Sequence, residues 1–271
     1  MTQVIELERI DQAEAGYFYH LTDAQLRSRQ EPDQAIFIAE GPKVAHTALD
    51  AGCEPLSILM RRKFIEDPQG QAILQKCGAI PVYTADDALL ERVTGFKLQR
   101  SWVLCAMRRP AARKPEEVLQ GARRVALLEG INDPSNVGAI FRSAAALGAD
   151  AILLSPTCCD PLHRRSVRVC MGSVFLVPWA RVGADNAFPL LREMGFETVA
   201  LALRDNCLSL DDPRLLQAKK LAICLGTEDT GLTEETIRQC DHVAKIPMAA
   251  GIDSLNVAAA AAIAFWQFRI R

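Results

Sequence analysis

The sequence predicts an α/β protein whose larger part is built around a parallel β-sheet. The chain has 271 residues, of which 49% are hydrophobic and 24% charged, as in a globular protein with a substantial core. Short apolar runs alternate with helix-like stretches, and most of these runs are continuous rather than alternating with polar residues. Continuous apolar strands are typical of a parallel sheet that helices cover on both faces.

The first part of the chain predicts a small α/β domain over residues 1–107. Its expected strands are 36–39, 56–60, 80–83 and 102–106, and its expected helices are 42–51, 68–77 and 86–93. A segment rich in Pro, Arg and Ala follows without hydrophobic periodicity, which predicts a linker over 108–121.

The alternation resumes with stronger strands over 122–271. The expected strands are 125–129, 151–155, 174–177, 198–203, 221–225 and 243–246, and the expected helices are 137–147, 188–194, 233–240 and 255–268. In parallel sheets, functional groups gather in the loops that follow the carboxyl ends of the strands. Three such loops have unusual chemistry here.

Composition narrows the class of protein. The nine cysteines form no C-x-x-C pair and the four histidines have no ligand spacing, so we expect free thiols, no metal and a reducing cytoplasmic setting. The longest apolar run, 257–266, is ten residues, about half of a membrane span. The polar, acidic start does not have the pattern of a signal peptide. Formal charge is −2, but local clusters such as 61–63 and 163–165 could contact phosphates.

The first loop runs from a strand through Asp133-Pro134 into a helix. Ser135 or Asn136 is expected to cap that helix, and Arg142 projects from its second turn. A helix start of this kind can hold an anion at its exposed amides. The alternative is a well-capped helix with a surface arginine. Neither G-x-G-x-x-G nor a phosphate-binding P-loop motif occurs, so a dinucleotide fingerprint is not supported.

The second loop has two glycines around two carboxylates. Gly226 can bring the backbone against a ligand, Gly231 permits a left-handed turn, and Thr233 can cap the next helix. The alternative is an acidic capping loop.

The third loop begins with Ile246-Pro247-Met248. Ser254 is the expected cap, and Asn256 is placed inside the first helical turn, where its helix propensity does not explain it. The alanine run 258–262 favours close packing against a neighbouring helix.

Together the three loops resemble the motifs of the SpoU (TrmH-type) RNA 2′-O-ribose methyltransferases of the SPOUT superfamily. The first matches N-x-G-x-x-x-R, the second resembles G-x-E-x-x-G-L, and the third resembles I-P-M followed by S-L-N-V, in the family's order and spacing. Thr227 and Cys170 stand where Asn and Ser are frequent in the family. The segment F-I-A-E-G at 37–41 is similar to the L30e/L7Ae-like substrate-binding domain of such proteins.

The resemblance implies an L30e-like RNA-binding domain over 1–107, followed in sequence by a SPOUT domain over 122–271. In a SPOUT domain the C-terminal segment passes through a loop of the chain and forms a deep trefoil knot. Knots are otherwise very rare in proteins. It also implies S-adenosyl-L-methionine (AdoMet) as cofactor, rRNA or tRNA as substrate, and a homodimer. Backbone groups at Gly226, Ile246 and Leu255 would bind AdoMet, with Thr227 and Met248 beside them. A side chain at position 226 would occupy cofactor space.

The catalytic residues implied by the resemblance are Arg142, Asn136, Glu228, Ser254 and Asn256. Arginine stays protonated near neutral pH, so we expect Arg142 to hold the neighbouring phosphate or to stabilise the developing alkoxide. It would act as the base only with assistance from the RNA phosphate. We also expect the partner chain to supply this arginine.

Two other functions are compatible with the residues. One is a catalytically inactive RNA-binding relative that keeps the SPOUT fold, which the intact motif residues argue against. The other is an unrelated nucleotide-binding α/β enzyme, such as a dehydrogenase, which the missing glycine fingerprint argues against.

Overall fold

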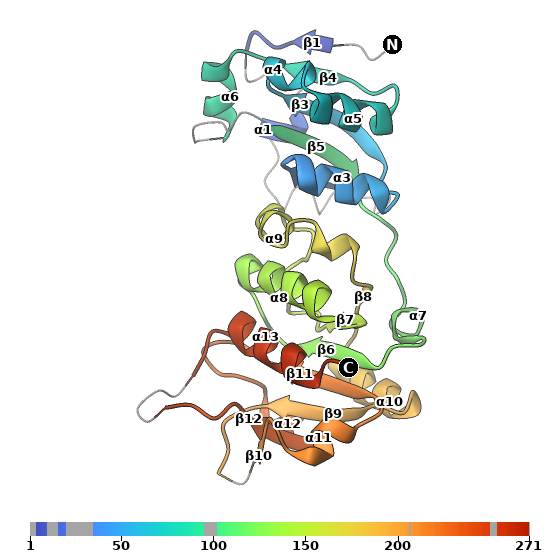
Figure 1. Cartoon of the computed structure of the whole chain (residues 1–271), viewed down its shortest axis with the longest axis vertical. Helices are drawn as coiled ribbons and strands as arrows, with labels where there is room; N and C mark the ends of the chain where they lie inside the picture. The colour runs from blue at the N-terminus through green and yellow to red at the C-terminus, as the bar shows by residue number, and fades with distance from the viewer. Residues whose placement is uncertain are drawn as a thin grey trace. The chain divides into compact units, whose positions relative to one another are not determined.

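The computed structural model describes residues 4–9, 16–19, 35–94, 102–205, 207–249 and 254–270. The chain divides into two compact units (Figure 1): Met1–Ala111 with Leu162–Phe175, and Ala112–Pro161 with Leu176–Arg271. The predicted boundaries at 107 and 121 remain a prediction. The sequence did not indicate that 162–175 packs with the first unit.

The first unit has a five-stranded mixed sheet in the order β1-β4-β3-β5-β2. Its strands are β1 Val4–Glu6, β2 Ile36–Glu40, β3 Pro55–Met60, β4 Val82–Thr84 and β5 Val103–Arg108. Its helices are α1 Gly16–Tyr19, α3 Pro42–Asp50, α4 Arg62–Ile65, α5 Pro68–Cys77, α6 Asp87–Thr94 and α9 Arg164–Val169. Every strand and helix predicted for this part forms, with ends shifted by up to two residues.

The second unit has a seven-stranded sheet in the order β10-β12-β9-β11-β6-β7-β8, and every neighbouring pair in it is parallel. Its strands are β6 Arg124–Leu128, β7 Ala151–Leu154, β8 Trp179–Arg181, β9 Glu197–Leu201, β10 Leu208–Ser209, β11 Leu221–Leu225 and β12 His242–Lys245. Its helices are α7 Pro115–Leu119, α8 Pro134–Leu147, α10 Ala184–Glu193, α11 Pro213–Gln217, α12 Glu234–Gln239 and α13 Val257–Phe268. The α/β class with a parallel sheet is therefore confirmed.

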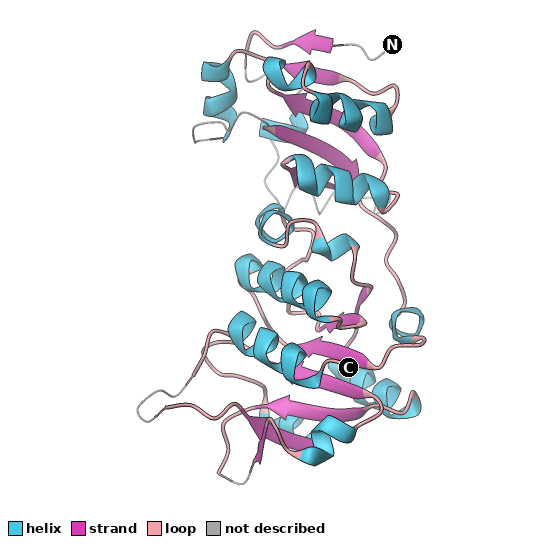
Figure 2. Ribbon diagram, in the orientation of Figure 1, coloured by secondary structure: helices cyan, strands magenta, loops and turns pink. Residues whose placement is uncertain are grey.

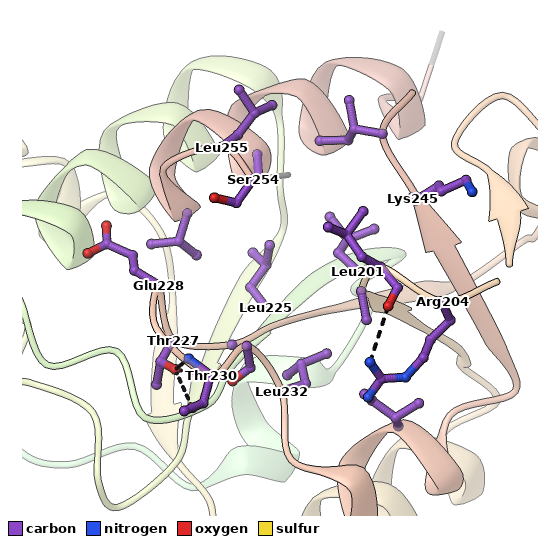
Figure 3. A pocket seen from close by; sticks show the side chains of 18 of the residues that line it. Leu201, Arg204, Leu225, Thr227, Glu228, Thr230, Leu232, Lys245, Ser254 and Leu255 are labelled. Atoms are coloured by element: carbon purple, nitrogen blue, oxygen red, sulfur yellow. Dashed lines mark hydrogen bonds between the residues drawn. The ribbon is translucent and has the colours of Figure 1, made fainter. Parts of the chain in front are cut away.

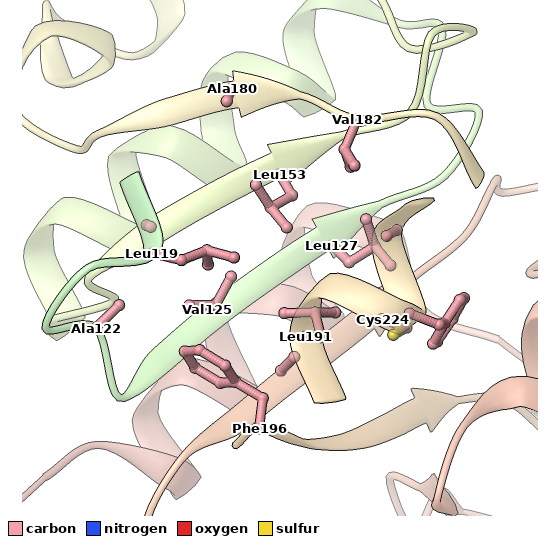
Figure 4. Packing of buried hydrophobic residues seen from close by; sticks show 14 of the residues in the cluster. Leu119, Ala122, Val125, Leu127, Leu153, Ala180, Val182, Leu191, Phe196 and Cys224 are labelled. Atoms are coloured by element: carbon pink, nitrogen blue, oxygen red, sulfur yellow. The ribbon is translucent and has the colours of Figure 1, made fainter. Parts of the chain in front are cut away.

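The central strands of this sheet are covered on both faces (Figure 2). Every residue of β6, β7 and β11 is buried. On one face, Val125 and Leu153 pack with Leu119 of α7 and Leu191 of α10 (Figure 4). Elsewhere in the unit, α8 and α13 pack against each other. Burial on both faces explains why these strands have continuous apolar sequences.

The predicted strand 174–177 is wrong. Ser173–Phe175 forms a 3-10 helix, and the strand of this region is β8, which begins after Pro178. Val174 and Phe175 are apolar because Val174 is buried and Phe175 packs on Phe37, with ring centroids 5.3 Å apart. An apolar run indicates burial, but it does not by itself distinguish a strand from other buried segments.

The predicted linker contains a short helix, α7. α7 begins with a proline, carries Glu116 and Glu117 in its first turn, and buries Val118 and Leu119. Two buried side chains in five residues are too few to produce a visible hydrophobic period.

A buried arginine fixes the end of the chain to the sheet. Arg124, at the start of β6, is 8% exposed and donates to the carbonyl oxygens of Phe268 at 2.6 Å, Ala218 at 3.0 Å and Lys219 at 3.1 Å. Burial lowers the pKa of the Arg124 guanidinium, and Arg123 acts in the same direction. The carbonyl partners offset the cost of burying this cation. The bond to Phe268 attaches the C-terminal end of α13, the helix that follows the third sequence motif, to β6.

Candidate active site

Three loops leave the second sheet at its carboxyl edge. They follow β6, β11 and β12, and their described residues are 129–133, 226–233, 246–249 and 254–256. Because all strands of this sheet are parallel, the three loops emerge at the same edge. The three sequence motifs are therefore close to one another in space.

The first loop ends in a helix that Asp133 caps. The Asp133 carboxylate accepts a hydrogen bond from the Ser135 N–H at 2.8 Å, and Pro134 is the first helical residue. The prediction that Ser135 or Asn136 caps this helix is wrong, because both residues lie inside its first turn. Asn136 is 7% exposed, and its amide is directed to the other two loops.

The second loop needs glycine at position 226 for a reason internal to the loop. A Cβ atom there would lie 2.2 Å from the carbonyl carbon of Gly231 and 2.3 Å from its oxygen. Thr227 and Gly231 exchange two backbone hydrogen bonds, at 3.0 and 3.1 Å, and Gly231 has a φ of +70°. Thr233 caps α12, as predicted. The tight backbone of the loop thus excludes a side chain at 226 without any ligand.

The third loop ends in a helix that Asn256 caps. Its Oδ1 accepts hydrogen bonds from the N–H groups of Ala258 at 2.9 Å and Ala259 at 3.4 Å. Two predictions are therefore wrong: Ser254 is not the cap, and Asn256 does not lie inside the first turn. Asparagine is among the preferred capping residues, which accounts for it at the position before Val257.

One side chain from each of the three sequence motifs joins a single hydrogen-bonded cluster. Asn256 Nδ2 donates to Asn136 Oδ1 at 3.0 Å and to Glu228 Oε1 at 2.6 Å, and Asn136 Nδ2 donates to the same Glu228 oxygen. Residues up to 120 positions apart in sequence thus meet around one carboxylate. We call Asn136, Glu228 and Asn256 the amide–carboxylate cluster. It holds the three loops in one arrangement, since each member bonds to both of the others.

A pocket of about 300 Å³ opens beside this cluster (Figure 3). It contains all five residues predicted to bind a cofactor, together with two of the predicted catalytic residues. These lining residues are Gly226, Thr227, Ile246, Met248, Leu255, Glu228 and Ser254. Apolar walls come from Leu201, Leu225 and Leu232.

The pocket is polarised along its length. In Figure 3, Glu228 and Thr227 lie on one side, and Arg204 and Lys245 lie on the other. Arg204 pairs with Glu234 and donates to the carbonyl oxygen of Leu203 at 3.1 Å. The sequence analysis missed both cations. Their signal was their position, three residues after β9 for Arg204 and at the end of β12 for Lys245, near the strand ends where a parallel sheet binds its ligands.

Three predicted catalytic residues do not line this pocket: Asn136 and Asn256, which belong to the amide–carboxylate cluster, and Arg142, which does not. Arg142 is exposed on α8, and within the described ranges it forms no hydrogen bond or ion pair. A cationic side chain of this kind is available to a ligand or to another chain.

The cysteines carry no sign of a site. All nine are free. The sulfur atoms of Cys224 and Cys240 lie 3.7 Å apart in a thiol–thiol hydrogen bond, and this bond together with burial raises the pKa of Cys224 well above its usual range. Cys224 therefore stays a neutral thiol in the hydrophobic core. Among the described residues, no group of His, Cys, Asp and Glu could hold a metal ion, and no helix is long and apolar enough to cross a membrane.

Comparison with known proteins identifies the family. Residues 123–266 match the SpoU rRNA methylase family model. The chain belongs to the SpoU rRNA methylase family. An uncharacterized tRNA/rRNA methyltransferase of Mycobacterium bovis is 39% identical over 253 residues, which cover 92% of this chain and 86% of that protein. The 23S rRNA (guanosine(2553)-2′-O)-methyltransferase RlmP of Bacillus subtilis is 31% identical over 155 residues, 57% of this chain and 61% of that protein.

The fold of this SpoU protein matches solved relatives along the whole chain. The AdoMet-bound rRNA methyltransferase from Sinorhizobium meliloti is 26% identical, with a TM-score of 0.82 over 98% of this chain and 97% of that one. Family membership excludes the alternative of an unrelated dehydrogenase.

Proposed function

We propose that this SpoU protein transfers a methyl group from AdoMet to a ribose 2′-hydroxyl of rRNA or tRNA in the cytoplasm. The observation that carries the proposal is the amide–carboxylate cluster. Three motif side chains from three loops share one hydrogen-bonded arrangement at a pocket that contains the predicted cofactor residues. An AdoMet-bound rRNA methyltransferase shares the fold at 26% identity.

The pocket suits AdoMet in size and character. Its ≈ 300 Å³ volume is at the lower end of the roughly 300–1,000 Å³ of small-molecule sites. Leucine side chains offer apolar contact to an adenine ring, and Arg204 and Lys245 offer positive charge to a carboxylate. Gly226, Ile246 and Leu255 are the residues we expect to bind the cofactor through their backbone. When bound, AdoMet supplies a methyl group activated by its positive sulfonium.

The chain's own side chains would then prepare the acceptor. Arg142 is exposed and unpaired among the described residues, so it can bind the phosphate next to the target ribose or stabilise the alkoxide that develops at the 2′-oxygen. Asn136 and Asn256 hold Glu228 in place, and Ser254 lies in the pocket wall. We infer that these residues keep the three loops, and the trefoil knot expected from the family, in the reactive arrangement.

A homodimer is part of the proposal. An apolar stripe runs along α13 and the residues at its ends: Leu255, Ala259, Ile263, Trp266 and Ile270. Ala259, Ile263 and Trp266 are three or four positions apart, which places them on one face of the helix, and Leu255 and Ile270 are exposed just beyond its two ends. Trp266 is 56% exposed and Ile263 39%. An exposed apolar face of this kind marks an interaction site, and we propose a second copy as its occupant.

The oligomeric state can be tested on the stripe itself. Trp266→Glu should shift the protein from dimer to monomer in multi-angle light scattering, whereas Gln267→Glu, at the next position, should leave the dimer intact. A wild-type protein that stays monomeric at tens of micromolar would overturn the dimer.

The origin of Arg142 can be tested by mixing two inactive variants. If the partner supplies the arginine, mixed dimers of Arg142→Ala and Gly226→Ala chains contain one intact site and regain activity. If each chain uses its own arginine, no mixed dimer contains an intact site and the mixture stays inactive.

The RNA is expected to contact basic residues of the first unit, mainly through its phosphates. Lys63 and Arg165 are exposed. Other members of the same clusters are already engaged, because Arg62 pairs with a glutamate of β1 and Arg164 pairs with the buried Glu40 at 3.0 Å. Arg62 and Arg164 are thus neutralised by carboxylates of the protein, whereas the exposed Lys63 and Arg165 can bind RNA phosphates.

Isotope transfer tests the proposed reaction. Purified protein, methyl-deuterated AdoMet, and rRNA or tRNA from cells that lack this gene are incubated together, and the nucleosides are analysed by mass spectrometry. The label should appear in 2′-O-methylnucleosides, within dinucleotides that resist nuclease. Label confined to bases would overturn the 2′-O assignment. Cofactor binding without any transfer would indicate the inactive RNA-binding relative.

A further inference from the structure

Glu129 occupies a position that joins two of the three motif loops. It follows β6 directly and is half-buried. Its Oε1 accepts hydrogen bonds from the hydroxyls of Thr233 at 2.9 Å and Thr236 at 3.0 Å. Its Oε2 accepts from the Thr233 N–H at 3.2 Å. A carboxylate that accepts three such bonds forms stronger contacts than a neutral acceptor would.

The same residue also holds the opposite end of the second loop. The Glu129 backbone N–H donates to the carbonyl oxygen of Leu225 at 2.9 Å. Leu225 is the last residue of β11, and Thr233 caps α12. Residues 226–232 therefore lie between two anchor points that both belong to Glu129.

Gly130, the residue after Glu129, lies close against the second loop. Gly130 has a φ of +68°, and a Cβ atom there would lie 3.0 Å from the Thr227 methyl carbon. The chain after β6 thus passes directly along the second loop. The anchored segment contains Gly226 and Thr227 of the pocket wall and Glu228 of the amide–carboxylate cluster.

We propose that Glu129 is a positioning residue that sets the affinity for AdoMet by clamping residues 226–232 at both ends. This inference rests on the proposed function, which places AdoMet in that pocket. Glu129 does not line the pocket, so it acts through the loop rather than by touching the cofactor. Replacing its carboxylate with an amide keeps the volume but removes the negative charge and leaves one acceptor oxygen in place of two.

Calorimetric titration of AdoMet into the full-length protein tests the clamp. Glu129→Gln should weaken AdoMet binding by about tenfold, because neutral hydrogen bonds replace the charged ones that hold the loop. Glu235→Gln is the matched control, because Glu235 is exposed on α12 and bonds only to Arg238 and Gln239 of the same helix among the described residues. This control should bind AdoMet as the wild type does.

Two further readouts separate positioning from a loss of folding. An irreversibly misfolded fraction lowers the number of binding sites per chain and leaves the affinity of the folded fraction unchanged. A positioning role lowers the affinity at full stoichiometry in a variant whose urea unfolding shows that it is fully folded without AdoMet. Thr236→Val as a single substitution should also weaken AdoMet binding. In the double variant with Glu129→Gln it should weaken AdoMet binding little further, because the two side chains share one hydrogen bond.

An unchanged AdoMet affinity in Glu129→Gln would overturn this inference and leave the proposed function standing. Wild-type protein that binds AdoMet but methylates no RNA would overturn the proposed function and leave the clamp standing. Wild-type protein that does not bind AdoMet would overturn both.

Discussion

Asn256 performs two tasks that substitutions can separate. Its Oδ1 caps α13, and its Nδ2 donates to Asn136 and Glu228. Asn256→Ser keeps a good capping residue but loses both donated bonds. Asn256→Ala loses the cap as well. The difference in unfolding free energy between the two variants therefore isolates the cap.

The structure sets the expected magnitudes. Removing a cap costs about 1 kcal/mol. Asn136 is 7% exposed, so leaving its Oδ1 without a donor costs about 1–3 kcal/mol. Glu228 is exposed, and water replaces the lost donor there at little cost. We expect Asn256→Ser to be destabilised by about 1–3 kcal/mol and Asn256→Ala by about 1 kcal/mol more.

Urea unfolding followed by circular dichroism measures these differences. Ser254→Ala is the control, because the sequence placed the cap at Ser254 whereas the structure places it at Asn256. This control should change the unfolding free energy by less than about 0.5 kcal/mol. A large loss in Ser254→Ala, or equal stability of the two Asn256 variants, would refute the assignment of the cap.

Three other substitutions test separate parts of the account. Gly226→Ala should abolish detectable AdoMet binding in calorimetry, because its Cβ would meet the Gly231 backbone at 2.2 Å; wild-type affinity would show that the loop can open at no cost. Arg142→Ala should lower turnover at least a hundredfold, roughly the loss on removing one charge-stabilising donor, and leave AdoMet affinity unchanged; wild-type turnover removes the residue from the mechanism. Arg124→Met should lower the urea unfolding free energy by about 2–4 kcal/mol, because Phe268 and the other buried carbonyl groups lose their donor; a change below about 0.5 kcal/mol would mean that the arginine is not needed there.

The fold was predictable from the sequence where a buried segment is also a strand, so that its apolar run indicates both. β6 and β11 are buried on both faces, and their continuous apolar sequences indicated a parallel sheet. The pattern failed at 174–177, where Val174 is buried and Phe175 packs on an aromatic ring outside any strand. It also missed α7, whose two buried side chains show no period.

The site was predictable in its residues but not in its contacts. The motifs placed Asn136, Glu228 and Asn256 together, and the structure shows them bonded to one another. The capping role of each residue depends on where its helix begins. The sequence placed the start of the last helix at 255, whereas α13 begins at Val257, so Asn256 is its cap and not a residue of its first turn. Glu129 was missed because its partners, Thr233 and Thr236, lie more than a hundred positions away.

The central claim is that the pocket at the carboxyl edge of the second sheet holds the methyl donor beside the amide–carboxylate cluster. A crystal structure of the protein grown with AdoMet tests it most directly. The account predicts density for one AdoMet per chain in this pocket, in contact with Gly226, Ile246 and Leu255. AdoMet bound elsewhere on the chain, with this pocket empty, would contradict it.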